Sequence, residues 1–175
     1  MRKATKKVIG FVVLVVLMMV LLTGAALAFE NEPEGFRGLK WGDPPMEEMI
    51  VYDAYPLVNC YTLPDESLYL GNVKLNLIEY QFFSSPEGEI FWGIGLYFRG
   101  EDNYDLMEIF CKDEFGEETL KTWDGLNWYS QETMVILSYD LTEETGYLAM
   151  LSTPLMQQQQ MAVEKLESEK AAKDW

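Results

Sequence analysis

The hairpin that decides the fold is the segment 73–99, which reads VKLNLIEYQFF (73–83), SSPEG (84–88) and EIFWGIGLYFR (89–99). Apolar residues alternate with polar ones over 73–77, and they alternate again over 78–82 with the phase shifted by one residue. A period of two is typical of a strand with one buried face. Since a strand cannot change faces without cost, we expect a β-bulge near Leu77 and Ile78.

The partner strand, 90–99, presents a different set of side chains on each face. One face carries large apolar residues: Ile90, Trp92, Ile94, Leu96 and Phe98. The other face carries the candidate ligand-binding residues: Phe91, Gly93, Gly95 and Tyr97. Two glycines on one side of a strand cost stability unless something approaches the backbone closely. We therefore expect either a ligand slot walled by the two aromatic rings, or close packing of a helix over the glycines.

The helix that would cover the glycines is expected over 103–115, because three apolar residues share one face there: Leu106, Ile109 and Phe110. Gly116 follows at the position of a left-handed C-terminal cap. The residues around the helix start are expected to cap it: Glu101, Asp102, Asn103 and Asp105. They look like calcium ligands, but the EF-hand spacing fails at Met107 and Asp113, so no metal site is predicted.

Further elements follow on both sides of this centre. Upstream we expect a strand over 36–41, a short helix that starts at Asp43-Pro44-Pro45 and buries Met46, Met49 and Ile50, and a strand over 57–63. Downstream we expect a tight turn at Asp124-Gly125, strands over 134–141 and 147–152, and a helical tail. Because turns rather than crossovers join the strands, the predicted fold class is α+β, an antiparallel sheet of hairpins with helices packed over one face.

The first 28 residues have the layout of a secretory signal peptide. Arg2, Lys3, Lys6 and Lys7 form a basic start, residues 8–22 lack a polar side chain, and Ala26-Leu27-Ala28 supplies a small-residue cleavage site. We therefore expect an exported protein, periplasmic or extracellular, divided into a signal peptide (1–28), one α+β domain (29–153) and an exposed helical tail (154–175). The alternative is an uncleaved anchor in the inner membrane. A spanning helix needs about 20 apolar residues, and residues 8–29 can supply them if Thr23 and Gly24 are tolerated.

The composition excludes several classes of function. The chain has 13 basic and 29 acidic residues; four basic residues lie in the leader, so the predicted mature chain has 9 against 29, or −20. Such a surface repels nucleic acid and anionic lipid, and it can attract a cationic protein partner. The absence of histidine removes the commonest general base and the commonest transition-metal ligand. No catalytic residue, metal or cofactor is predicted.

The two cysteines, Cys60 and Cys111, leave two alternatives open. In an oxidising compartment they can form a disulfide, which would stabilise the fold by about 4 kcal/mol in the chain-entropy model. They can equally be two separate buried thiols. The sequence does not give the Cα separation that a disulfide requires.

The mature chain opens with F-x-G-L-x-W-G, formed by Phe36, Gly38, Leu39, Trp41 and Gly42. This opening resembles a loose group of small exported bacterial proteins that begin F-x-G-[LI]-x-W-G and continue with hairpins rich in aromatic residues. The later matching positions are Tyr80, Phe82, Gly116, Trp123 and Gly125. The resemblance implies export and architecture, and it implies no activity.

Two functions remain open at the level of sequence. The first is a non-enzymatic module that binds another protein. The alternative is a protein that binds or cleaves carbohydrate with aromatic and carboxylate side chains, since 23 of the 147 residues after the leader are aromatic. Aromatic side chains more often fill cores, where each buries a large area.

Overall fold

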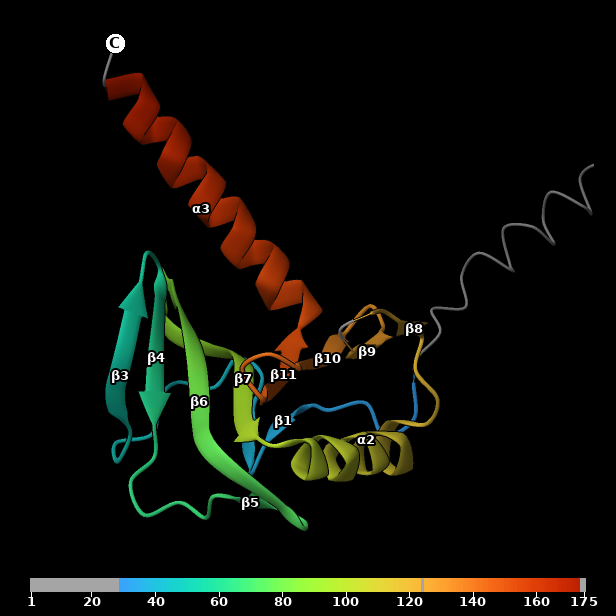
Figure 1. Ribbon diagram of the computed structural model, residues 1–175. Helices are drawn as coiled ribbons and strands as arrows, with labels where there is room; N and C mark the ends of the chain where they lie inside the picture. The colour runs from blue at the N-terminus through green and yellow to red at the C-terminus, as the bar shows by residue number, and fades with distance from the viewer. Residues whose placement is uncertain (1–28, 124, 174–175) are drawn as a thin grey trace, which may run out of the picture.

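The computed structural model describes residues 29–123 and 125–173, and the predicted signal peptide lies outside them. Nine strands form one antiparallel sheet in the order β3-β4-β6-β7-β11-β10-β9-β8, and β5 pairs with β6 beside this path (Figure 1). The strands are β3 (Ile50–Tyr55), β4 (Val58–Thr62), β5 (Tyr69–Leu70), β6 (Val73–Ser85), β7 (Gly88–Arg99), β8 (Leu120–Lys121), β9 (Gly125–Tyr129), β10 (Thr133–Asp140) and β11 (Thr145–Ser152). The predicted α+β class is confirmed.

The sheet consists of two meanders joined by one helix. β3 to β7 form the first meander and β8 to β11 form the second, with α2 (Glu101–Phe115) between them. The two meanders meet where β7 pairs antiparallel with β11, for example at Leu96 and Leu148. The predicted hairpin of β6 and β7 therefore lies in the middle of the sheet.

Two bulges interrupt the central hairpin. One lies between Leu75 and Leu77, which confirms the predicted change of phase near this point. The second was not predicted: Gln81 pairs with Gly93 but Phe82 pairs with Phe91, so Trp92 is an extra residue on β7. Because an extra residue reverses the alternation, Phe91 lies on the same face as Ile94, Leu96 and Phe98.

The prediction that Phe91 shares a face with Gly93, Gly95 and Tyr97 is therefore wrong. Phe91 is fully buried in the main core, where its ring lies 4.9 Å from the ring of Trp41. Gly93, Gly95 and Tyr97 lie on the opposite face of the sheet.

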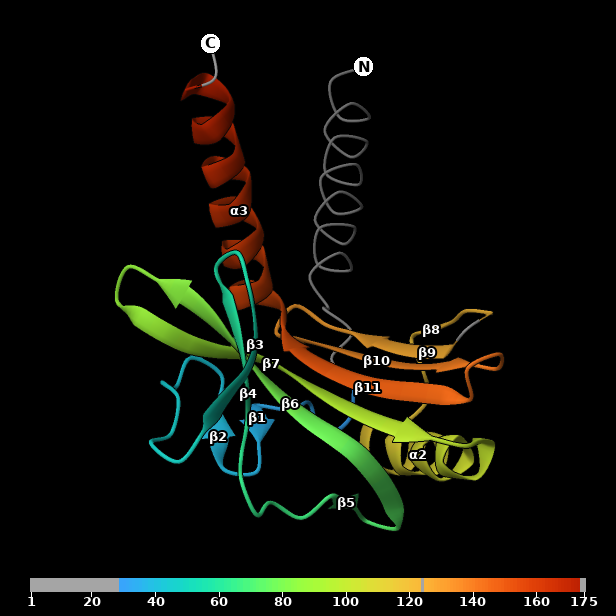
Figure 2. The same ribbon diagram turned by 60° about the vertical axis from the view of Figure 1, so that its left-hand side comes forward.

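One face of the sheet, called here the covered face, packs against α2 (Figure 2). The helix buries Met107, Cys111 and Phe115 there. The expected helix face was wrong, since Leu106 and Ile109 are exposed and α2 does not pack over Gly93 and Gly95. Gly116 ends the helix with a positive φ of 76°, but its ψ of −161° lies outside the left-handed helical region expected for this cap.

The expected side-chain caps of α2 are also absent. The N-cap is Gly100, and no side chain caps the helix there. The side chain of Asn103 instead joins two strands: its amide donates to the Arg99 carbonyl (2.7 Å) and its oxygen accepts from the Lys74 N–H (3.1 Å).

The predicted strand 36–41 is a small separate hairpin of β1 (Gly35–Phe36) and β2 (Leu39–Lys40). Its turn residues, Arg37 and Gly38, both have positive φ (48° and 88°), as a tight hairpin turn requires. The hairpin adds Phe36 and Leu39 to the covered face.

The short helix expected from Asp43 does not form. The Asp43 carboxylate accepts the Lys40 N–H (2.8 Å) and the Asp43 N–H donates to the Lys40 carbonyl (3.0 Å), so this residue closes a turn. The backbone of Gly42 and Asp43 then bonds to Phe91 in both directions at 2.8 Å. Ile50, expected on the helix, is the first residue of β3.

At the other end of the chain, α3 (Thr153–Lys173) leaves the end of β11 and projects away from the sheet (Figures 1 and 2). Most of its side chains beyond Met156 are exposed. No helix among the described residues is both long and apolar enough to cross a membrane.

Candidate functional site

The face opposite the covered face has a different construction. Among the described residues, side chains of the same face rather than a helix lie nearest to Gly93 and Gly95 and fill the space above them. A β-carbon on Gly95 would lie 3.0 Å from the Tyr97 ring, and one on Gly93 would lie 2.5 Å from Cδ2 of Leu151. The two glycines therefore make room for Tyr97 and Leu151.

Beside Tyr97 this face is hollowed into a groove with a volume of about 430 Å³. β3 supplies one wall, β6 and β7 supply the floor, and the start of β11 closes one end. The lining residues are Tyr52, Asp53, Tyr55, Asn76, Leu77, Glu79, Tyr97, Phe98, Arg99, Thr145 and Gly146. We call this hollow the β3 groove.

The floor of the β3 groove contains a buried carboxylate. Glu79 is only 8% exposed, and its Oε1 accepts hydrogen bonds from the Gln81 amide (2.8 Å) and the Tyr97 hydroxyl (3.5 Å). No Lys or Arg among the described residues forms an ion pair with it. Burial and the nearby Glu79 charge raise the pKa of Tyr97 to about 12. Tyr97 is therefore a hydrogen-bond donor at neutral pH.

The two cysteines are free and buried, so the disulfide alternative is not realised. Cys60 lies on β4 close to Glu79, whereas Cys111 lies on α2 against the covered face. Burial, and then the Glu79 charge, raise the pKa of Cys60 to about 12; burial likewise raises the pKa of Cys111. Since the thiolate is the nucleophile, neither side chain is a reactive cysteine.

The outer wall of the groove is the edge strand β3, and every residue of this strand is exposed. Its four large apolar side chains are 54% to 59% exposed: Ile50, Val51, Tyr52 and Tyr55. Tyr52 is an extra residue at a bulge, since Val51 pairs with Tyr61 and Asp53 with Cys60. The Asp53 carboxylate accepts both the Ala54 N–H and the Tyr55 hydroxyl, each at 2.8 Å.

Sequence reasoning missed β3 as a site. Its β-branched and aromatic run, IVYDAY, was a strand signal. The helical spacing of Met46, Met49 and Ile50 competes with that signal and favours a helix, which does not form. Of the predicted ligand residues, only Tyr97 lines the β3 groove; Gly93 and Gly95 lie on the same face, and Phe91 does not.

Within the part of the chain that the structure describes, no group of three or more Cys, Asp or Glu side chains is arranged to hold a metal ion. No protein-family model, no curated protein and no solved structure matches this chain. The β3 groove and the edge strand are therefore the features from which a function can be inferred.

Proposed function

We propose that this protein is an exported protein-interaction module that binds a basic, extended segment of another protein along β3. The order of basic, apolar and small residues in 1–28 supports export. One observation carries the binding proposal: β3 is an edge strand, and all six of its residues are exposed. The proposal assigns no catalytic residue.

An edge strand offers a partner both backbone and side-chain contacts. Among the described strands β3 pairs only with β4, so its outer edge is open to a further strand. An added strand gains affinity from main-chain hydrogen bonds and specificity from side-chain pockets. Contiguous exposed apolar surface, such as that of Ile50, Val51 and Tyr52, is typical of an interaction site.

Charge favours a basic partner over a second copy of this chain. The protein has a net charge of −16, and Glu47, Glu48 and Asp53 lie just before or within β3. Like charges on two copies would repel each other. A Lys or Arg placed opposite Asp53 would form an ion pair instead.

The experiment measures binding of a short alternating Lys-Val peptide to residues 29–175 by fluorescence anisotropy. We expect saturable binding that weakens with salt, and no binding of the matched Glu-Val peptide. Val51→Ser should weaken binding about tenfold, or about 1.4 kcal/mol, because it removes apolar contact area.

Leu120→Ser is the matched control, because Leu120 is half exposed on β8 at the other edge of the sheet. It should leave the affinity for the Lys-Val peptide unchanged. Equal loss in both variants, or dimers of the parent protein that Val51→Ser dissociates, would contradict the proposal.

A carbohydrate ligand is the second candidate, because the β3 groove combines Tyr52, Tyr55 and Tyr97 with the carboxylates of Asp53 and Glu79. Aromatic rings and acceptor oxygens in a hollow fit a neutral sugar that donates hydrogen bonds. Isothermal titration with a cellulose or chitin oligosaccharide separates the two candidates. Sugar binding that Tyr55→Ser abolishes, without peptide binding, would favour the carbohydrate function.

A further inference from the structure

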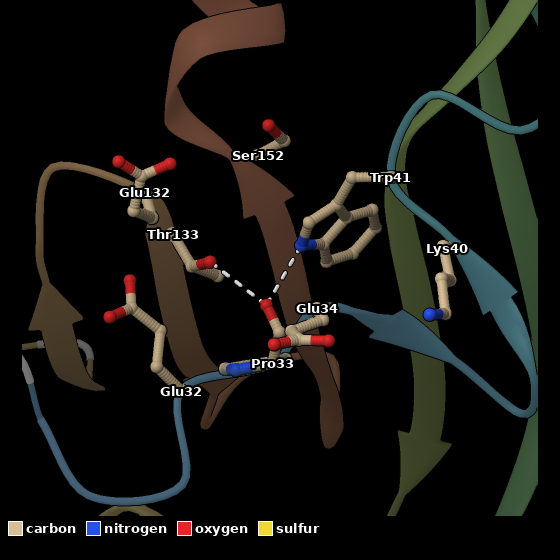
Figure 3. Close-up of a pocket in the computed structure, with 8 residues that line it drawn as sticks. All are labelled: Glu32, Pro33, Glu34, Lys40, Trp41, Glu132, Thr133 and Ser152. Atoms are coloured by element: carbon tan, nitrogen blue, oxygen red, sulfur yellow. Dashed lines mark hydrogen bonds between the residues drawn. The ribbon is translucent and has the colours of Figure 1, made fainter.

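A second hollow lies at the end of the covered face, and it shares no residue with the β3 groove. Its volume is about 420 Å³. The lining residues come from four separate parts of the chain: Glu32, Pro33, Glu34, Lys40, Trp41, Glu132, Thr133 and Ser152. In Figure 3, Glu32, Glu132 and Thr133 lie on one side and Lys40 and Trp41 on the other, with Pro33 and Glu34 at the base and Ser152 above. We call it the Trp41 pocket.

Hydrogen bonds hold the walls of the Trp41 pocket in place. The Pro33 carbonyl accepts both the Trp41 indole N–H (2.8 Å) and the Thr133 hydroxyl (3.0 Å), as the dashed lines in Figure 3 show. The Trp41 backbone N–H donates to the Glu34 carbonyl (3.0 Å), and the Ser130 hydroxyl donates to Glu32. These bonds join the segment before β1 to the turn before β10.

The Trp41 ring is a fixed platform. Its indole N–H donates a hydrogen bond to the Pro33 carbonyl, and its ring centroid lies 4.9 Å from that of the buried Phe91 ring. Trp41 is only partly buried, and it lines the pocket. A ligand would therefore meet an aromatic surface that needs no reordering, which lowers the entropic cost of binding.

Several polar groups around the pocket are left unused. Ser152 is only 4% exposed and lines the pocket, yet its hydroxyl has no hydrogen-bond partner among the described residues. The carboxylates of Glu32, Glu34 and Glu132 form no ion pair within the described part of the chain. The Ser152 hydroxyl and these carboxylates are therefore available to a ligand that enters the pocket.

The charge of the lining selects the kind of ligand. Three carboxylates against the single ammonium group of Lys40 give a net charge of −2. Acceptor oxygens outnumber donors, so the ligand must donate hydrogen bonds and carry positive charge. An indole ring attracts a cation that lies over its face, and tryptophan is the best aromatic residue for this contact.

We propose that the Trp41 pocket binds an organic cation, an ammonium or guanidinium group that lies against Trp41 and is neutralised by Glu34 and Glu132. The group can belong to a free small molecule or to a Lys side chain of another protein. The inference is independent of the β3 edge, because neither its residues nor its experiment involve that strand.

The experiment is isothermal titration of residues 29–175 with choline, with agmatine and with the tripeptide acetyl-Gly-Lys-Gly-amide. We expect saturable binding of at least one cation below about 10 mM, weakened by added salt. The double variant Glu34→Gln/Glu132→Gln should weaken it about tenfold or more, since it removes both unpaired charges and keeps the side-chain shapes.

The matched control is Glu47→Gln/Glu48→Gln, which removes the same charge from two exposed residues outside the pocket. It should leave the affinity within about twofold, which separates a local contact from the general field of an acidic protein. Tight binding of the tripeptide identifies a protein side chain as the source, whereas binding of choline or agmatine alone identifies a free amine. Binding of none of the three, equal loss in both double variants, or binding of neutral cellobiose in place of the cations overturns the proposal.

Discussion

The two faces of the sheet are formed by the same strands, but they are closed in different ways. On the covered face, α2 and the β1–β2 hairpin seal an apolar core that includes Phe82, Phe91 and Trp128, all fully buried. On the opposite face, Tyr97 and Leu151 fill the space over the glycines, and a buried Glu79 lies in the floor of a groove.

The difference shows where stability and function are divided. Burying a carboxylate such as that of Glu79 without a cation costs free energy, so this side chain does not stabilise the fold. Residues that break local rules of stability are expected at functional sites. We therefore assign folding mainly to the covered face, and binding to the face with the β3 groove and to the Trp41 pocket at the end of the covered face.

The largest expected effect lies on the covered face. Phe91→Ala should destabilise the protein by about 3–5 kcal/mol, because it opens a cavity among the rings of Trp41, Tyr80 and Phe82. Urea denaturation measures the change. Tyr52→Ala, on the exposed rim of the β3 groove, should change the free energy of unfolding by no more than about 0.5 kcal/mol. Equal losses in the two variants would mean that the faces do not differ in this way.

Gly93→Val tests how the other face is closed. The new side chain would displace Leu151, whose Cδ2 lies 2.5 Å from the β-carbon position, and should cost about 1–3 kcal/mol. Leu151→Ala in the same chain should recover part of that loss, because it vacates the space. If Gly93→Val melts like the parent, the glycine faces open space and the ligand slot over these glycines becomes the better interpretation.

Alkaline pH is expected to lower stability through two groups on the face with the β3 groove. The pKa of Cys60 rises from 9.0 and that of Tyr97 from 10.0, each to about 12 in the folded state. A group whose pKa is raised by folding stabilises the protein below its unfolded pKa, and this contribution is lost as the pH approaches the folded pKa. The free energy of unfolding should therefore fall as the pH passes 9.0 and then 10.0. Tyr97→Phe should make this decline shallower; an unchanged decline would mean that Tyr97 is not the buried group inferred here.

Alternation of apolar residues predicted the strands that have one buried face. The clearest case is β10, where buried residues alternate with less buried ones from Thr133 to Leu137. β3 shows no such alternation because both of its faces are exposed, so its β-branched and aromatic run was outweighed by the helical spacing of the residues before it. Phe91 was placed on the wrong face because the bulge at Trp92 lies within an apolar run, where an extra residue leaves no trace in the pattern.

The two hollows could not be predicted from local sequence patterns, and the reason is a different one. The Trp41 pocket joins residues from Glu32 to Ser152, and the hydroxyl of Thr133 meets the carbonyl of Pro33 across 100 residues. The sequence contains the F-x-G-L-x-W-G motif that includes Trp41. The residues that surround Trp41 in the folded protein, however, depend on how the two meanders meet. Contacts of this kind are set by the tertiary arrangement rather than by local propensity.

The smallest expected effect is the dependence of stability on pH between about 6 and 8, because no histidine is present to titrate there. The surroundings of Cys60, Tyr97 and Cys111 raise the pKa of each group and so move its titration away from this range. The one ordinary exception is the α-amino group of Phe29 if the leader is cleaved. The ring of Phe29 lies 5.8 Å from that of Phe115, so this group would sit at the edge of the covered face.

Melting temperatures of residues 29–175 should stay level across the range. A steep slope that persists after acetylation of the amino group would require a strongly perturbed carboxylate or thiol, and such a group would make a catalytic site credible on one of the two faces.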